Sequence, residues 1–122
     1  MEPCHLFVYG TLRKGFHNKY ARLLHSRAAF VGRARIPGRL YDLGWHPGAV
    51  ASRTTGEWVR GEIFRLANQS LILPILDAYE GPSFERVSVT AQLDSGRERE
   101  CWVYLWIGNR TGRPIPSGVW SS

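Results

Sequence analysis

The sequence predicts an α+β fold with a mostly antiparallel or mixed, curled sheet. Two observations lead to this class: β-type runs and turns alternate along the chain, and only two short helical stretches interrupt them at uneven intervals. A parallel sheet would instead require regular alternation of strands and helices. The 122 residues, 43% of them hydrophobic, are enough for one core, so we expect a single domain over residues 1–122.

The first half of the chain predicts one short strand, one helix and two longer strands. His5–Tyr9 is a compact β-type run, and Asn18 is a suitable N-cap for a short helix. The residues from Phe30 to Leu43 have an extended pattern, and Pro47-Gly48 is a turn signal. Trp58–Leu66 is predicted to be the next strand.

A second helix follows, and it is the most informative segment. Ser70 can cap it, and Gly81 followed by Pro82 provides a C-terminal stop. Pro74 fits this helix only if it lies in the first turn. Apolar residues recur at helical spacing and predict a buried stripe of Ile72, Ile75, Leu76 and Tyr79.

The last elements form the clearest predicted hairpin. In residues 87–93 apolar and polar side chains alternate, which is typical of a strand with one face in water. Asp94-Ser95-Gly96 can turn the chain back into the wholly apolar run Cys101–Ile107. The tail from Gly108 contains two prolines and is predicted to be irregular.

Composition and charge exclude several classes of protein. Only Cys4 and Cys101 are present, so a disulfide-rich secreted scaffold is excluded and the reducing cytoplasm is the expected compartment. The longest apolar run has seven residues, too few to span a membrane, and the N-terminus lacks the pattern of a signal peptide. The net charge is +6, but the arginines are scattered along the chain, so a nucleic-acid partner is not expected.

Three common kinds of site are missing from the sequence. Gly10 and Gly15 have the spacing of a phosphate-binding loop, but Phe16 and His17 stand where Lys and Ser or Thr are required. The four histidines and two cysteines lack the close pairings of metal sites. We therefore expect no metal or other cofactor, and the histidines are predicted to be ordinary surface or interface residues. No Gly-x-Ser-x-Gly motif indicates a serine nucleophile.

The first candidate for a functional site is Tyr9-Gly10-Thr11-Leu12-Arg13, where the first predicted strand ends. A glycine after a buried strand lets the backbone turn sharply, and the free N–H groups that follow can form a concave site for an anion such as a carboxylate. A plain β-turn explains the same residues. The spacing alone leaves both interpretations open.

The second candidate is Glu80, the last residue before the helix stop. On a helical wheel it lies at the border of the apolar stripe, so it should be half sheltered from water. Desolvation, the negative end of the helix dipole and the like charge of Asp77 would all raise the pKa of Glu80. A carboxyl group with a raised pKa can transfer protons near neutral pH. The alternative is an exposed residue at a helix end.

Five ordered motifs, which span nearly the whole chain, give the sequence a family likeness. They are Leu6–Arg13 (LFVYGTLR), Gly38–Gly44 (GRLYDLG) with Pro47–Ala49, Val59–Phe64 (VRGEIF), Leu76–Gly81 (LDAYEG) with Phe84–Arg86, and Trp102–Tyr104. In these motifs the sequence resembles the γ-glutamylcyclotransferase-like (AIG2-like) family, most closely its short bacterial YtfP-type members. It departs from the family at Val119, where relatives often have Asp.

The resemblance implies a small mixed β-barrel flanked by short helices, with the substrate in a cavity at the barrel mouth. It further implies that the Tyr9-Gly10-Thr11-Leu12 loop binds the γ-glutamyl group, largely through main-chain groups, and that Glu80 is the catalytic acid/base. Arg13 is expected to be structural. Glu62 is expected to support the cavity, paired with an Arg.

The activity that the resemblance implies is a ring closure without a cofactor. The α-amino group of a γ-glutamyl amine, amide or dipeptide attacks the γ-carbonyl, which gives 5-oxoproline and releases an amine. The loop N–H groups would bind the α-carboxylate or stabilise the oxyanion, and the sequence leaves both open. The expected partner is a small γ-glutamyl molecule, with no membrane partner and no prediction of oligomeric state. The alternative is a non-catalytic module that binds a small ligand or nucleic acid on the same barrel.

Overall fold

In residues 3–109 and 112–121, which this computed structural model describes, the chain forms seven strands and two helices. The helices are α1 (Lys19–Arg27) and α2 (Gln69–Glu80). The strands are β1 (His5–Val8), β2 (Ala28–Asp42), β3 (Pro47–Ala51), β4 (Trp58–Leu66), β5 (Phe84–Leu93), β6 (Glu98–Trp106) and β7 (Arg113–Pro114). Neither helix in these residues is long and apolar enough to cross a membrane.

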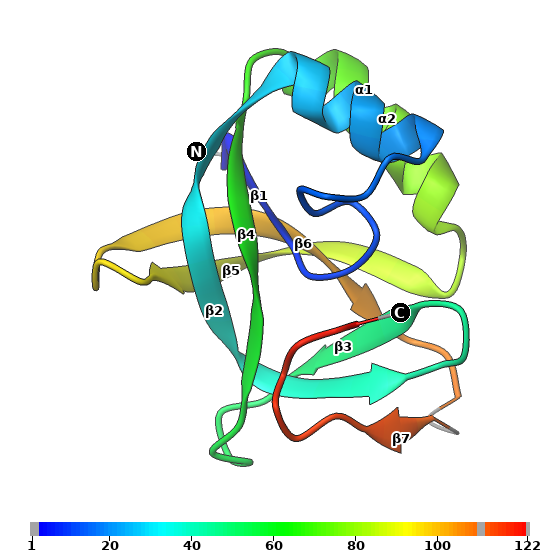
Figure 1. The fold of residues 1–122 in the computed structure, drawn as a ribbon, viewed down its shortest axis with the longest axis vertical. Coiled ribbons are helices and arrows are strands. Elements are labelled where there is room, and N and C mark those ends of the chain that lie inside the picture. The colour runs from blue at the N-terminus through cyan, green and yellow to red at the C-terminus, as the bar shows by residue number, and fades with distance from the viewer. Residues whose placement is uncertain (1–2, 110–111, 122) are drawn as a thin grey trace.

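Five strands close into a barrel. β2 pairs with β4, β4 with β1, β1 with β6 and β6 with β5, and β5 returns to β2. Only the β1–β6 pair in this ring is parallel. In Figure 1 the two helices lie together at one end of the barrel, and β3 and β7 lie at the opposite end. The predicted α+β class and the mixed barrel flanked by short helices are both confirmed.

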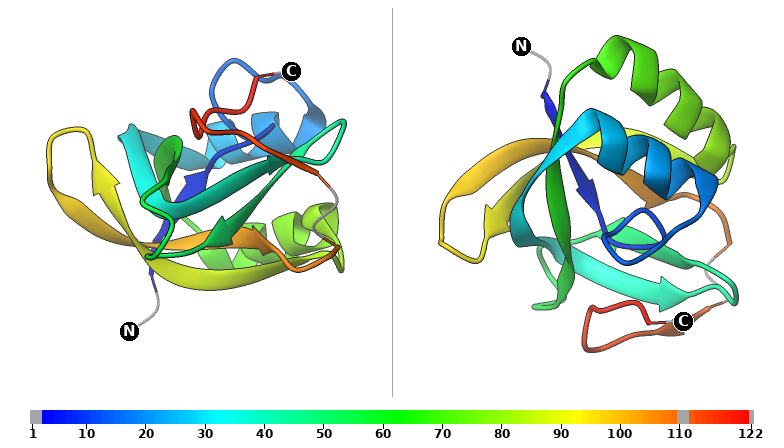
Figure 2. Two further views of the ribbon diagram at one scale, coloured as in Figure 1. Left: turned by 90° about the horizontal axis from the view of Figure 1, so that it is seen from below. Right: turned by 45° about the horizontal axis from the view of Figure 1, so that its top comes forward.

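The hydrophobic core has two parts, one inside the barrel and one between its wall and the helices. β1 serves both, because Phe7 belongs to the first part whereas Leu6 and Val8 belong to the second. A strand buried on both faces has no polar alternation. Figure 2 shows both helices on the same side of the barrel, where they cover this wall.

The N-terminal half follows the prediction except at one turn. The Asn18 side chain caps α1 by accepting hydrogen bonds from the N–H groups of Tyr20 and Ala21, at 3.1 and 2.8 Å. Pro47-Gly48 was predicted to be a turn, but the two residues begin β3, and the turn lies in residues 43–46. Pro47 is tolerated as the first residue of a strand, and Gly48 packs so closely on Trp106 that a Cβ would overlap that side chain.

Helix α2 differs from the prediction at its N-terminus. The helix begins after Asn68, and the predicted cap Ser70 lies inside the first turn, where its hydroxyl donates to the Asn68 side chain. Pro74 lies in the second turn rather than the first. It is exposed there, so its missing N–H costs one helical hydrogen bond without a clash in the core.

The buried face of α2 is also rotated relative to the predicted stripe. Leu73 is buried, whereas Ile75 is 37% exposed. The face against the barrel therefore runs along Ile72, Leu73 and Leu76. Since Glu80 follows Leu73 and Leu76 at helical spacing of seven and four residues, this rotation turns Glu80 toward the barrel.

The C-terminal half forms the predicted hairpin, with Val87 paired to Val103 and the turn at residues 94–96. The tail is less irregular than predicted, because β7 pairs with the end of β2. Trp120 is also part of the barrel core, with 4% of its surface exposed. The tail therefore contributes to the packing of the barrel.

Candidate functional site

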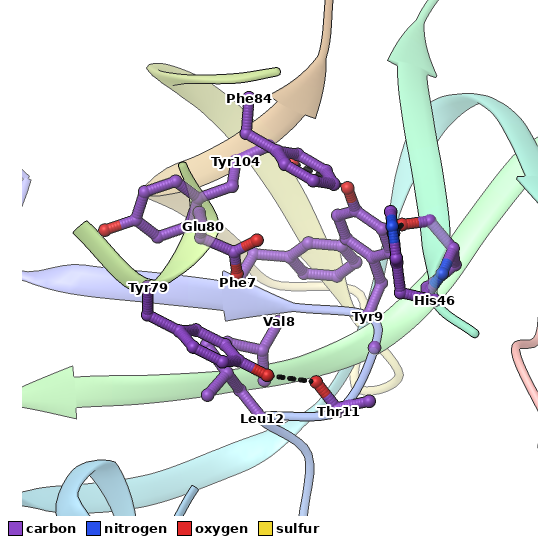
Figure 3. A pocket seen from close by; sticks show the side chains of 12 residues that line it. Phe7, Val8, Tyr9, Thr11, Leu12, His46, Tyr79, Glu80, Phe84 and Tyr104 are labelled. Atoms are coloured by element: carbon purple, nitrogen blue, oxygen red, sulfur yellow. Dashed lines mark hydrogen bonds between the residues drawn. The ribbon is translucent and has the colours of Figure 1, made fainter. Parts of the chain in front are cut away.

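A cavity of about 230 Å³ lies where β1 ends and α2 ends (Figure 3). The Tyr9–Leu12 loop and Glu80 are remote in sequence, and both line it. All the residues that the sequence singled out as catalytic or substrate-binding are therefore brought to one place. The lining residues are Phe7, Val8, Tyr9, Gly10, Thr11, Leu12, His46, Pro47, Tyr79, Glu80, Phe84 and Tyr104.

Side chains hold three consecutive carbonyl groups of the loop. The carbonyl of Gly10 accepts from Arg13 Nε at 3.1 Å, and the carbonyl of Thr11 accepts from Asn18 Nδ2 at 2.8 Å. The carbonyl of Leu12 lies 2.8 Å from His25 Nε2, which can donate to it. The loop is therefore fixed on its carbonyl side by three residues that follow it in the sequence.

The N–H groups of the same loop are not used in this way. The Arg13 N–H closes a turn onto the Gly10 carbonyl at 3.2 Å. The N–H groups of Gly10, Thr11 and Leu12, by contrast, donate to no residue that the structure describes. The loop thus contains a β-turn and also offers free main-chain donors at the cavity, which is the chemistry of an anion site.

Arg13 has the structural role that was expected. Besides the Gly10 carbonyl, it donates to the carbonyl of Trp120 and so ties the loop to the tail. Glu62 supports the loop differently from the prediction. Its carboxylate accepts from the N–H of Lys14 at 2.7 Å and forms no salt bridge with an Arg among the described residues, and it lines a separate surface pocket.

Tyr9 contributes to the site mainly as a cross-link. Its hydroxyl donates to the carbonyl of Tyr104 at 2.6 Å and accepts from the N–H of Ala49 at 3.1 Å. Both contacts are buried, and burial raises the pKa of the Tyr9 phenol. Because the hydroxyl donates its hydrogen to Tyr104, it has none left to donate to a ligand.

Glu80 carries a half-buried carboxyl group that has no hydrogen-bond partner among the described residues. No described residue donates a hydrogen bond to its carboxylate, which in Figure 3 lies between the rings of Phe7 and Tyr104. Burial alone raises its pKa to about 7. A carboxyl group in this state exchanges its proton near neutral pH, and it is available to a bound molecule.

Asp77 does not contribute to the raised pKa of Glu80, although the sequence suggested that it would. Its carboxylate accepts from Arg86 Nε at 2.8 Å and from the Tyr104 hydroxyl at 2.7 Å. Burial of Asp77 opposes ionisation, but these hydrogen bonds outweigh it and hold the pKa of Asp77 below its usual range. Arg86 therefore balances the charge of Asp77, and Asp77, Arg86 and Tyr104 all line a neighbouring pocket.

One hydrogen bond links the loop directly to the helix that carries Glu80. Thr11 Oγ1 lies 2.9 Å from the Tyr79 hydroxyl, and both groups line the cavity (Figure 3). The Tyr79 ring also stacks on Tyr20 of α1, with centroids 4.2 Å apart. Tyr79 is therefore held by its ring and holds Thr11 by its hydroxyl.

This link predicts a result for Tyr79→Phe. The substitution keeps the ring and its stacking and removes the hydrogen bond, so the free energy of unfolding should fall by about 1 kcal/mol. Thr11→Val should lower the free energy of unfolding by about the same amount. The double variant should lose clearly less than the sum of the two single losses, because both substitutions remove the same hydrogen bond. Urea denaturation of the four proteins measures this. Additive losses would mean that the two hydroxyls do not depend on each other.

Seven residues that line the cavity were not assigned to the site from the sequence: Phe7, Val8, His46, Pro47, Tyr79, Phe84 and Tyr104. His46 was predicted to be an ordinary surface or interface residue, yet its ring packs near Phe84, with centroids 5.8 Å apart. An isolated histidine gives no signal of its own in a single sequence. The only available pointers were the neighbouring motifs, since His46 precedes Pro47–Ala49 and Phe84 begins Phe84–Arg86.

Comparisons with known proteins show which proteins this chain resembles in sequence and fold. A protein of Vibrio cholerae, provisionally named a gamma-glutamylcyclotransferase, is 32% identical over 116 residues, which are 94% of this chain and 93% of that protein. The solution structure of ytfP from Escherichia coli matches with a TM-score of 0.65 and 30% identity over 95% of each chain. YkqA from Bacillus subtilis matches with a TM-score of 0.77 and 28% identity over 98% of this chain. The match covers 40% of YkqA, which is the longer protein.

The family model described as gamma-glutamyl cyclotransferase, AIG2-like, matches residues 6–122. That match covers both helices, the barrel strands apart from His5, and every residue that lines the cavity. The chain therefore belongs to the gamma-glutamyl cyclotransferase, AIG2-like, family.

Proposed function

We propose that this protein is a cyclotransferase that converts a γ-glutamyl amine, amide or dipeptide to 5-oxoproline and a free amine. The observation that carries the proposal is that one cavity brings together a half-buried carboxyl group with a raised pKa and main-chain N–H groups that donate to no described residue. The N–H groups suit the anionic glutamyl part of such a substrate, and the carboxyl group suits the proton transfers. Membership of the family supports the same reaction.

The proposed reaction needs no nucleophile from the protein. Glu80 removes a proton from the α-ammonium group of the substrate, and the nitrogen lone pair attacks the γ-carbonyl carbon. A C–N bond forms and closes the five-membered ring, and the negative charge passes to the carbonyl oxygen. When the carbonyl re-forms, the bond to the leaving nitrogen breaks, and that nitrogen takes the proton that Glu80 received. The ring nitrogen gives up its second extra proton at the same stage, and the released amine takes it and leaves as the ammonium form. No water is consumed, and the two products together contain all the atoms of the substrate.

The cavity also contributes to the rate by holding the substrate in a folded conformation. Its α-amino group reaches the γ-carbonyl only when the glutamyl chain is folded, and a cavity of about 230 Å³ can restrict it to that shape. Well-oriented intramolecular reactions reach effective molarities of roughly 10⁵ M or more. The rigid loop, fixed through the carbonyls of Gly10–Leu12, provides a fixed surface for this restriction.

The test is the identity and isotope content of the products. The purified protein is incubated with a panel of γ-glutamyl amines and dipeptides in H₂¹⁸O, and the products are measured by mass spectrometry. We expect unlabelled 5-oxoproline and free amine in equal amounts. Glutamate that carries ¹⁸O would show hydrolysis and contradict the ring closure. Tight binding without any product would instead support the non-catalytic module.

The raised pKa of Glu80 predicts the pH dependence of catalysis. The carboxylate is the form that accepts the proton, so kcat/KM should rise with pH up to about 7 and level off above it. Below pH 7 it should fall about tenfold per pH unit. Measurements of kcat/KM between pH 5 and 8 at constant ionic strength test this. A fall in kcat/KM that is centred near the usual glutamate pKa of about 4.5 would contradict a raised pKa for the catalytic base.

A further inference from the structure

One wall of the cavity is aromatic. The rings of Phe84 and Trp106 meet edge to face, with centroids 5.3 Å apart and planes at 71°. His46 lies beside both rings, at 5.8 Å from Phe84 and 6.0 Å from Trp106. We name these three residues the aromatic wall. His46 and Phe84 line the cavity, and Trp106 lies behind them.

The aromatic wall is held in place by the surrounding structure. Its members come from three separate segments, namely the residue before β3, the start of β5 and the end of β6. Trp106 Nε1 donates to the carbonyl of Asn109 at 2.9 Å, and the backbone of Gly48 packs directly on the Trp106 side chain. A ring that is fixed before binding loses little conformational entropy when a ligand packs on it.

The position of the aromatic wall indicates which part of the substrate it would contact. In Figure 3 Thr11 and Tyr79 lie on one side of the Glu80 carboxylate and Phe84 lies on the other, with His46 beyond the Tyr9 ring. A substrate whose glutamyl part is at the loop N–H groups and whose reacting bond is at Glu80 has its leaving group on the remaining side. That side is the aromatic wall.

The chemistry of the lining points to the kind of leaving group. Six of the twelve lining residues carry an aromatic ring if His46 is included, and Glu80 is the only carboxylate among them. No Lys or Arg is among the lining residues. Aromatic rings prefer edge-to-face or offset contacts with another ring, and such pairs contribute about 0.5–1.5 kcal/mol beyond the burial of area.

We propose that the aromatic wall is a specificity site that selects γ-glutamyl compounds whose leaving amine carries an aromatic ring. The inference rests on the proposed cyclotransferase reaction and deepens it. Phe84 and His46 contact the leaving ring, and Trp106 positions Phe84. The leaving ring enters the cluster as a further edge-to-face partner while the glutamyl part stays at the loop.

The test compares two amides with the same γ-glutamyl part, γ-glutamyl benzylamide and γ-glutamyl cyclohexylmethylamide. The saturated ring has a similar shape and is at least as hydrophobic, so the comparison isolates the aromatic contact. We expect kcat/KM to be about fivefold higher for the benzylamide. Phe84→Leu should remove this preference, so that the ratio of kcat/KM between the two amides falls to about one. His46→Phe, which keeps a ring, should retain it.

The control variant is Phe30→Ala, which removes an exposed aromatic side chain that does not line the cavity. It should leave the ratio of the two substrates unchanged. Equal kcat/KM for the two amides, or a preference that survives in Phe84→Leu, would overturn the aromatic wall alone and leave the cyclotransferase proposal intact. Absence of 5-oxoproline from every γ-glutamyl compound would overturn the proposed function and this inference together.

Discussion

Replacement of Glu80 by Gln is expected to lower kcat/KM by about 10² to 10⁴-fold, which is the usual contribution of a positioned acid/base. The amide has nearly the same shape as the carboxyl group but cannot accept the ammonium proton. Since no described residue donates to the Glu80 carboxylate, the substitution breaks no hydrogen bond of the folded protein. The measurement is 5-oxoproline release under single-turnover conditions with a γ-glutamyl amine that the wild type converts.

Glu85→Gln is the matched control for this variant. Glu85 is an exposed glutamate five residues further along, outside the cavity, so its variant should keep the wild-type rate within about twofold. A Glu80→Gln protein that also keeps the wild-type rate would show that Glu80 is not the base. Loss of activity in both variants would point to a general effect of charge.

The same substitution should stabilise the folded protein at alkaline pH. Burial raises the pKa of Glu80 to about 7, so the folded state holds this proton more tightly than the unfolded chain does. The free energy of unfolding therefore falls as pH rises from the unfolded value of about 4.5 to 7, by about 2–3 kcal/mol. Glu80→Gln should recover much of this at pH 8 and little at pH 4. The protein thus keeps a destabilising group where the proposed chemistry requires it.

The second large effect is expected for Gly61→Ala. Gly61 lies in β4, beside the end of its antiparallel neighbour β1. A Cβ at this position would overlap the carbonyl oxygen of Val8 and approach the Phe7 ring. Backbone cannot move aside as a flexible side chain can, so we expect the free energy of unfolding to fall by about 3 kcal/mol, at the upper end of overpacking effects. The end of β1 should shift as well, and the Tyr9–Leu12 loop follows it directly.

Gly32→Ala is the control for this prediction. Gly32 also lies in a barrel strand, but its new Cβ would meet only the end of the Leu93 side chain, at 3.3 Å. Because that side chain can adjust, the loss should stay below about 1 kcal/mol. Urea denaturation of both variants gives the comparison. Equal losses would mean that the close approach of β1 and β4 is not what requires glycine at position 61.

Much of the fold was predictable because its signals are local. The N-cap at Asn18, the alternation in residues 87–93 and the turn after Leu93 each depend on a few neighbouring side chains. The β3 start and the face of α2 were not predictable in this way. Pro47-Gly48 has the composition of a turn, and only the packing of Gly48 on Trp106 shows why it belongs to a strand.

The candidate site, like the fold, was predictable where its signals are local and not where it depends on tertiary packing. The loop and Glu80 were singled out because each has a local motif. The cause of the raised pKa was only partly predicted, because the rotation of α2 buries Glu80 and the contact with Arg86 balances Asp77. Both depend on tertiary packing. The aromatic wall was not predictable, since His46, Phe84 and Trp106 meet only when three distant segments pack together.

The bond from Arg13 to the carbonyl of Trp120 joins residues that are 107 positions apart. A ribosome adds about 5–20 residues per second, so roughly 5–20 s separate the synthesis of the two partners. During that interval the apolar strand β1 also lacks its parallel partner β6, which is made late. The loop therefore reaches its final form only after Trp120 has left the ribosome. Until then one edge of the hydrophobic strand β1 stays without its partner, which is the kind of segment that chaperones bind.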